Sequence, residues 1–267
     1  MRYHKYPPPP ALAAFVRCFW IMEGNGGNGD PSLYRLFASS CPELVVQYRN
    51  RFTDFDRHGQ SSLSPLVHLY GQTQEYRETM VAGEYGIAGA YLYPYAVKAL
   101  TGMPASEMSN RVMDMGSNDV AARMSEAGSD QARIKVFSDY LLSTFRSAAE
   151  PDKGLQACIW QLIHTKGATD IGSMADMLFV SGRQLERRFQ QGLGLSPKLC
   201  SRIIRFQSTL HVQEREPGKR LTDIAYESGY FDQSHFIREF REFSGFSPKD
   251  YFLEDPDEIA DSFIKIS

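Results

Sequence analysis

A stretch in the C-terminal half of the chain occurs twice. Residues 174–198 (MADMLFVSGRQLERRFQQGLGLSPK) match residues 224–249 (IAYESGYFDQSHFIREFREFSGFSPK). An alanine, a large apolar residue, an arginine, a phenylalanine and a Gly-x-Ser-Pro-Lys ending recur in the same order, and the second copy is one residue longer in its middle. Because a repeated sequence indicates a repeated structural unit, any fold for this chain must contain the same local structure twice.

Each copy has the pattern of a helix, a tight turn and a second helix. Four residues of the second copy fall at the spacing of one helix face: Leu221, Ile224, Ala225 and Ser228. Gly229 suits the position just after a helix, where φ is often positive. Asp232 can cap the following helix by accepting from its free N–H groups, as Ser181 can in the first copy. We therefore predict two helix-turn-helix motifs, joined by an amphipathic helix that begins at Ser196-Pro197.

The second helix of each motif has a polar face that fits the major groove of DNA. In the second copy, Arg238 can donate to guanine, Gln233 can pair with adenine, and Ile237 can pack on a thymine methyl group. In the first copy Glu186 can accept from cytosine N4, although it repels phosphate. The residues predicted to contact DNA are Ser181, Arg183, Gln184, Glu186, Arg187, Gln233, Ser234, His235, Ile237, Arg238 and Arg241.

A purely structural role is the alternative for some of these residues. Arg187 and Arg238 could be solvated, or could pair with Glu186 and Glu239. His235 precedes a core phenylalanine, so it can serve either as a hydrogen-bonding structural residue or as a phosphate contact.

The rest of the chain indicates an α+β protein. Short apolar runs at 43–48, 66–70 and 86–96, separated by turn residues, predict strands, and aromatic clusters fit the core of a β-barrel or jelly roll. Helical periodicity begins near residue 117. Charge, Pro and Gly at 148–154 mark a boundary. We predict a β-rich, jelly-roll or cupin-like domain with helices (1–150), an all-α domain (151–253) and an acidic tail (254–267).

Composition limits the classes of function. The net charge of −3 argues against non-specific nucleic-acid binding, so local geometry must carry any DNA recognition. No apolar run reaches the length of a membrane helix, and the N-terminus lacks a secretory signal. The cysteines have no CxxC spacing, which favours reduced thiols in the cytoplasm. We find no HxH, HExxH, GxGxxG or Walker motif, and therefore expect no catalytic residues, no metal and no cofactor.

The doubled motif, ending in GYFDQSHFIREFREFSGFSPKDY, resembles the AraC/XylS family of bacterial transcriptional regulators. The resemblance covers residues 153–253 and implies a seven-helix DNA-binding domain. Its recognition helices would be residues 181–191 and 232–243, entering successive major grooves on one face of the duplex. Arg183 and Glu186 depart from the family's usual residues, which leaves the target sequence open. The N-terminal half more loosely resembles the β-rich sensory domains of some members.

Three functional hypotheses follow from these patterns. The first is a cytoplasmic transcription factor controlled by a small molecule or partner at its N-terminal domain, and the second is a regulator whose N-terminal half only dimerises. The third is a cupin-like enzyme with a DNA-binding appendage. Expected partners are double-stranded DNA, RNA polymerase, a small-molecule effector and a second copy of the chain. The dimer would form through the N-terminal domain or through the helices between 117 and 147, and packing within the domain is the alternative for the apolar residues of those helices. These residues are Val120, Met124, Ile134, Phe137, Tyr140 and Leu141.

Overall fold

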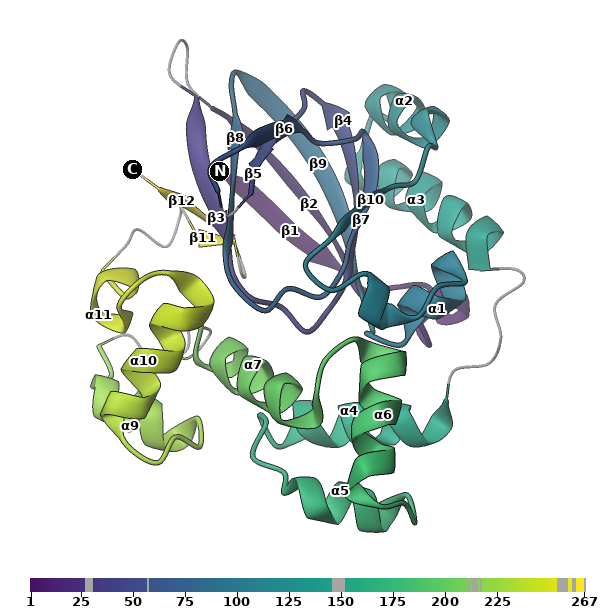
Figure 1. Ribbon diagram of the computed structural model, residues 1–267. Coiled ribbons are helices and arrows are strands. Elements are labelled where there is room, and N and C mark those ends of the chain that lie inside the picture. The colour runs from purple at the N-terminus through teal and green to yellow at the C-terminus, as the bar shows by residue number, and fades with distance from the viewer. Residues whose placement is uncertain are drawn as a thin grey trace.

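The computed structural model describes residues 1–26, 31–56, 58–145, 152–210, 212, 216, 218–253, 259–260 and 263–266. It confirms the α+β class: a β-rich domain comes first, and a helical domain with two helix-turn-helix motifs follows it (Figure 1).

The described strands form two six-stranded antiparallel sheets, and all of them except β11 and β12 come from the first domain. The order in the first sheet is β1 (Arg2–Tyr6), β2 (Val16–Asn25), β9 (Glu84–Leu92), β4 (Glu43–Arg49), β7 (Val67–Tyr70) and β10 (Val112–Asp114). The order in the second is β11 (Ile259–Ala260), β12 (Phe263–Ile266), β3 (Ser32–Leu36), β8 (Arg77–Val81), β5 (Thr53–Phe55) and β6 (Ser61–Leu63). The predicted strands at 43–48, 66–70 and 86–96 correspond to β4, β7 and β9, but β9 ends at Leu92 and a helix begins at Ala96.

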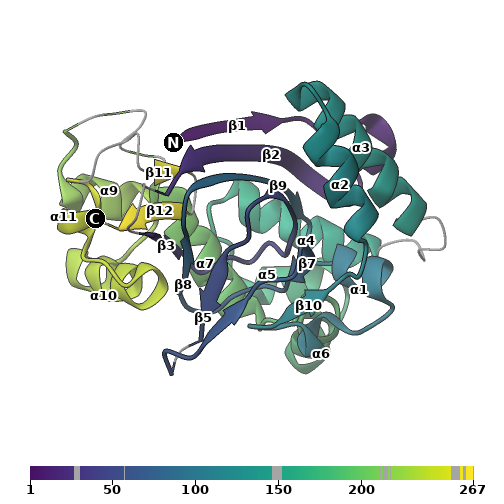
Figure 2. The same cartoon turned by 90° about the horizontal axis from the view of Figure 1, so that it is seen from above.

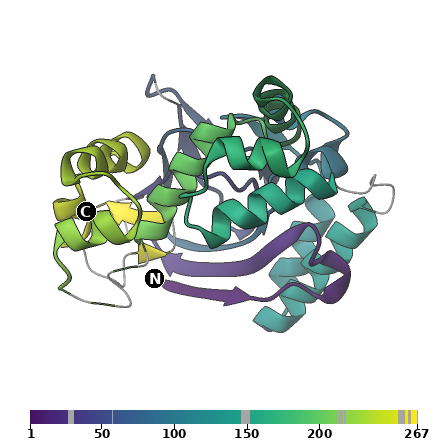
Figure 3. The ribbon, with the colours of Figure 1, turned by 90° about the horizontal axis from the view of Figure 1, so that it is seen from below.

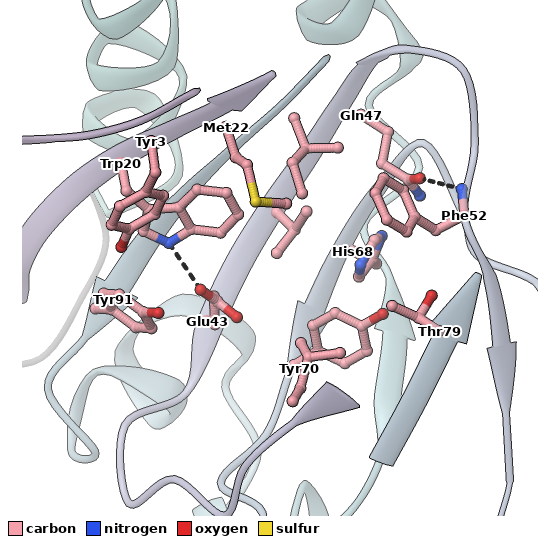
Figure 4. Close-up of a pocket in the computed structure, with 13 residues that line it drawn as sticks. Tyr3, Trp20, Met22, Glu43, Gln47, Phe52, His68, Tyr70, Thr79 and Tyr91 are labelled. Carbon is pink, nitrogen blue, oxygen red and sulfur yellow. Dashed lines mark hydrogen bonds between the residues drawn. The ribbon is translucent and has the colours of Figure 1, made fainter. Parts of the chain in front are cut away.

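The first sheet is covered on both faces. One face and the second sheet enclose an aromatic core that includes Trp20, Tyr34 and Tyr85, and there the Trp20 indole N–H donates to Glu43 (Figure 4). Helices α2 (Asn118–Glu126) and α3 (Asp130–Thr144) lie beside the first sheet (Figure 2), and together with α1 (Ala96–Thr101) they form a second hydrophobic core with its other face. Of the six apolar residues from which we predicted a dimer, four are buried in this second core, and Ile134 and Tyr140 are partly buried and pack against it. These residues therefore do not form a free dimer surface.

The helical domain consists of α4 (Lys153–His164), α5 (Ile171–Met177), α6 (Gly182–Leu193), α7 (Pro197–Leu210), α9 (Leu221–Glu227), α10 (Gln233–Ser244) and α11 (Pro248–Tyr251). Figure 3 shows α4 to α7, coloured teal to green, in front of the strands when the molecule is viewed from below. The two helices that we expected to read DNA are α6 and α10, and α7 is the amphipathic helix that joins the motifs.

The two domains share a hydrophobic core. Residues 146–151, where the predicted boundary begins, lie outside the described part of the chain, and α4 starts after the cap residue Asp152. Phe37, Ala38 and Tyr93 of the β-rich domain are buried in the same cluster as the helices. Within the segment that we treated only as an acidic tail, β12 pairs with β3 of the second sheet. The helical domain therefore packs on the sheets and is tied to them at both of its ends.

Candidate nucleic-acid interface

In the first motif, a strained turn leads into a well-capped helix. Phe179 has a φ of 51°, in the left-handed region, and its side chain is 96% exposed. The backbone N–H of Gln184 donates to the Ser181 hydroxyl, and the N–H of Ser181 donates to the Gln184 side chain at 2.8 Å. This reciprocal capping box fixes the start of α6, because it satisfies two N–H groups that a helix end leaves free. The side chains of Ser181 and Gln184 are therefore already engaged within the protein.

The outward face of α6 is open. Arg183, Glu186 and Arg187 are exposed, whereas Leu185 and Phe189 are buried against the domain core. Within the described part of the chain, no ion pair or hydrogen bond ties the three charged side chains to another residue. The alternative that Arg187 is held by Glu186 is thus not what the structure shows, and this face is available for a ligand.

The turn of the second motif has the glycine conformation and the helix cap that the sequence predicted. Gly229 takes a φ of 77°, and the backbone N–H of His235 donates to the Asp232 carboxylate at 2.7 Å. Phe236 and Phe240 are fully buried and fix the rotation of α10. The predicted contact residues that are exposed on this helix are Ser234, Arg238 and Arg241, while Gln233, His235 and Ile237 are half-buried.

A charge network holds α10 to α7. The Arg202 Nε donates to Glu239, which is 3% exposed, at 2.5 Å, and one Arg202 Nη donates to Glu242 at 2.6 Å. Burial alone would lower the pKa of Arg202, but hydrogen bonds to these two carboxylates raise it above its ordinary value. Glu239 therefore pairs with Arg202 and not with Arg238.

His235 has a structural setting in the same network. Its Nε2 lies 3.2 Å from a Glu239 oxygen, and its ring meets the ring of Tyr230 edge-on at 5.3 Å. Sequence reasoning missed Arg202 and Glu239 as partners, because residues so far apart in the chain give no local signal.

A cleft runs between the two motifs along α7. Basic side chains that line it come from α7 and from α10: Lys198, Arg202, Arg205 and Arg238. Acidic side chains line it as well: Asp170, Glu239 and Glu242. Two of these, Glu239 and Glu242, already bind Arg202. The cleft therefore carries charges of both signs, and it places Arg238 of α10 beside α7.

Both recognition helices contact the β-rich domain by their C-terminal ends. The Ser109 hydroxyl donates to the carbonyl of Gly194, which follows α6, at 2.8 Å. The backbone N–H of Ala38 donates to the carbonyl of Phe243, near the end of α10, at 2.9 Å. The N-terminal ends of the helices, which carry Arg183 and Ser234, lie away from these contacts (Figure 1).

Comparison with known proteins agrees with this geometry. Residues 174–253 match a family model described as a helix-turn-helix domain, and residues 4–114 match one described as a domain of unknown function (DUF6597). The HTH-type transcriptional activator RhaS of Escherichia coli O1:K1 is 32% identical over 91 residues, which are 34% of this chain and 32% of that protein. RhaS of Citrobacter koseri is 33% identical over 109 residues, or 40% of this chain and 39% of that protein. Residues 174–253 are thus a helix-turn-helix domain similar to that of these AraC/XylS-type activators.

Solved structures extend the likeness in fold to both domains. ToxT from Vibrio cholerae aligns with a TM-score of 0.53 over 88% of this chain and 97% of that chain, at 12% identity. A second ToxT structure, with an unsaturated fatty acid bound, aligns with a TM-score of 0.54 over 90% of this chain and 96% of that chain, at 13% identity. At this identity the match shows the fold alone. The curated RhaS relatives are matched over only about a third of their length.

Two further observations concern the described residues. No helix in the described residues is both long and apolar enough to span a membrane. The same residues contain no group of three or more His, Cys, Asp or Glu side chains arranged to hold a metal ion.

Proposed function

We propose that the protein is a sequence-specific DNA-binding transcriptional regulator, with α6 and α10 in successive major grooves. The observation that carries this proposal is the pair of capped helices whose exposed polar faces belong to one domain. Base contacts would come from Arg183, Glu186, Arg187, Gln233, Ser234, Ile237 and Arg238, and phosphate contacts from His235 and Arg241. Ser181 and Gln184 would act mainly through the N-terminus of α6 that they cap.

Selection of bound sequences from a random duplex library tests this proposal. The full-length protein should enrich a site with two halves about 10 base pairs apart, since two helices on one face of DNA meet it one helical turn apart. A variant with Arg187→Ala and Arg238→Ala should enrich no such site, while Arg123→Ala, an exposed arginine on α2, should behave like the native protein. Enrichment of only one half-site would contradict the use of both motifs.

We propose further that a small molecule bound by the β-rich domain controls the DNA-binding domain. The shared hydrophobic core supports this, because it couples the packing of one domain to that of the other. The likeness to RhaS and to ToxT, one of whose structures holds a fatty acid, favours a regulator over an enzyme. Such a regulator would act in the cytoplasm, where it reaches both the chromosome and RNA polymerase.

A homodimer is also part of the proposed function. Its surface must differ from the apolar residues of α2 and α3, since these are buried within the domain. The edge strand β1 offers one side of the first sheet for pairing with a second copy. Light scattering with and without operator DNA measures the mass, and a monomer in both conditions would remove this claim.

A further inference from the structure

Arg205 of α7 contacts the loop that leads into the first motif. One Arg205 Nη donates at 2.9 Å to the carbonyl of Gly167, which lies between α4 and α5, and the Ser201 hydroxyl donates to the same oxygen at 2.6 Å. The loop also lies close to α7, because a Cβ on Gly167 would clash with the carbonyl oxygen of Ser201. These contacts hold the loop, and with it the start of α5, against α7.

The same arginine contacts the turn of the second motif. Its guanidinium lies over the ring of Tyr230, 5.6 Å from the ring centroid, and Tyr230 is 3% exposed. A guanidinium is attracted to an aromatic face at this distance, and more strongly where water is excluded. The Tyr230 ring in turn packs on Phe236 of α10, with ring centroids 5.2 Å apart. Arg205 is therefore connected to the second recognition helix through one buried ring.

The two motifs approach each other beside Arg205. A Cβ on Gly229, in the turn of the second motif, would lie 3.7 Å from the Ala168 Cβ and 3.8 Å from the Arg205 Nε. Ala168 follows Gly167 in the loop before the first motif. The side chain of Arg205 thus lies at the junction of this loop, α7 and the second turn.

Arg202, one turn earlier on α7, has different connections. Its described ion pairs are with Glu239 and Glu242, and both of these residues belong to α10. Arg202 therefore holds the second motif to α7, whereas Arg205 contacts both motifs.

A rigid junction between two recognition helices limits which DNA sites both helices can reach. One base pair added between two half-sites turns the second half-site by about 35° and shifts it by about 3.4 Å along the duplex. We propose that Arg205 is a positioning residue that fixes the angle between α6 and α10, and so restricts the protein to one spacing of its half-sites. This role rests on the proposed function, because both helices must read DNA.

Distance measurements without DNA test the bridge itself. Spin labels introduced as non-natural amino acids at Asp176 on α5 and Asp223 on α9, both exposed, report the distance between the motifs by electron paramagnetic resonance in the full-length protein. Arg205→Met keeps the apolar stem but removes the guanidinium, and should broaden the distance distribution. Lys198→Met removes a positive charge from the same helix and should leave the distribution as narrow as in the native protein.

Competition binding then measures the spacing preference. The probes are the operator selected from the random library and two copies with one base pair added or removed between the half-sites. The native protein should prefer the selected spacing by about tenfold, because a displaced half-site loses at least one bidentate base contact. Arg205→Met and Arg205→Lys should lose most of this preference, since a motif that can turn follows the displaced half-site. Lys198→Met should keep it.

The outcomes separate positioning from two other roles of Arg205. If Arg205 only binds phosphate, Arg205→Met weakens binding at every spacing alike, and Arg205→Lys, which keeps the charge but lacks the planar fork, behaves like the native protein. If Arg205 only stabilises the fold, both variants unfold more easily but keep the native spacing preference. Either result, or an unchanged distance distribution, overturns the proposal.

Two controls keep the test decisive. If Arg205→Met does not fold, Arg205→Lys takes its place in both measurements, and a native spacing preference in that variant overturns the positioning role. Failure of the native protein to bind any specific DNA refutes the proposed function instead, and the distance measurement then decides whether Arg205 fixes the angle between the motifs.

Discussion

The two helix-turn-helix motifs share a fold but differ in how firmly they are held. In the second, Gly229 makes the turn without strain, and Arg202 ties α10 to α7 through Glu239. In the first, Phe179 occupies the corresponding left-handed position, and the charged face of α6 has no partner among the described residues. The second motif is thus held in place by its own contacts. The first motif has a strained backbone at Phe179 and charged side chains on α6 without a described partner. This contrast suggests that the second motif positions the domain on DNA and the first adapts to the site.

Removing Arg202 should have the largest effect on this contrast. Arg202→Ala leaves the buried Glu239 carboxylate without its guanidinium, which should lower the free energy of unfolding by about 3 kcal/mol. This is the low end for a broken buried pair, because Arg202 remains partly exposed to water. Denaturant unfolding measures the loss. Glu242→Gln, at the exposed side of the network, is the matched control and should cost less than about 1 kcal/mol. A loss of similar size in both variants would mean that α10 is not specially held.

Single substitutions in α6 and α10 should show how much each motif contributes to operator affinity and to base preference. Arg238→Ala and Arg187→Ala should each weaken operator binding by about 1–3 kcal/mol and relax preference at one base pair. Competition binding against single-base variants of the selected site measures both the loss of affinity and the change in base preference. If Arg238→Ala weakens operator and random DNA equally, Arg238 binds phosphate and the reading of α10 as a base-specific helix fails.

Because the backbone at Phe179 is strained, we predict that a glycine at this position stabilises the protein. Phe179→Gly should raise the free energy of unfolding by about 1 kcal/mol, because a left-handed conformation is costly for residues with a Cβ. Gly229→Ala should lower it by a similar amount, because a residue with a Cβ is strained at a φ of 77°. No steric cost adds to this, since the new Cβ would meet Ala168 and Arg205 at ordinary contact distances. Thermal unfolding compares the two.

Phe179→Ala is the control for the ring alone. It retains the left-handed backbone and should bring little gain. A stabilisation by alanine as large as that by glycine would show that exposure of the ring, and not backbone strain, sets the cost.

The smallest expected effect concerns phosphate contacts outside the base-reading faces. Arg241 is exposed on the last turn of α10. Arg241→Gln should weaken binding to all sequences alike and reduce the slope of log affinity against log salt by about 0.9. Titrations at several salt concentrations measure this slope, with Lys135→Gln on α3 as the control. A change confined to one DNA sequence would place Arg241 among the base-reading residues.

Local signals in the sequence were enough to predict the helical domain. Asp232 and Ser181 cap the helices as expected, and Gly229, Gly194 and Gly245 take the positive φ values of helix ends. The positive φ of Phe179 could also have been predicted from the sequence. The repeat aligns Phe179 with Gly229, and so places an aromatic residue at a glycine position. These features depend on contacts within a few residues.

Contacts between distant parts of the chain could not be predicted. The pairing of Arg202 with Glu239, the strand formed by residues 263–266, and the meeting of Trp20 with Glu43 each join segments that no local pattern connects. The packing partner of the apolar faces of α2 and α3 could not be predicted either. Periodicity shows that a face is buried, but it does not say whether the partner is the same chain or a second copy.

The pairing of β12 with β3 restricts how the domains can move. The helical domain is attached to the β-rich domain by the chain before α4 and again by the strand after α11, so it cannot swing freely on a single hinge. Any rotation about these two connections must also break the Ser109–Gly194 and Ala38–Phe243 hydrogen bonds and repack the shared hydrophobic core. An effector that turned the helical domain would therefore have to alter these contacts, and the angle between α6, α10 and the DNA would change with them.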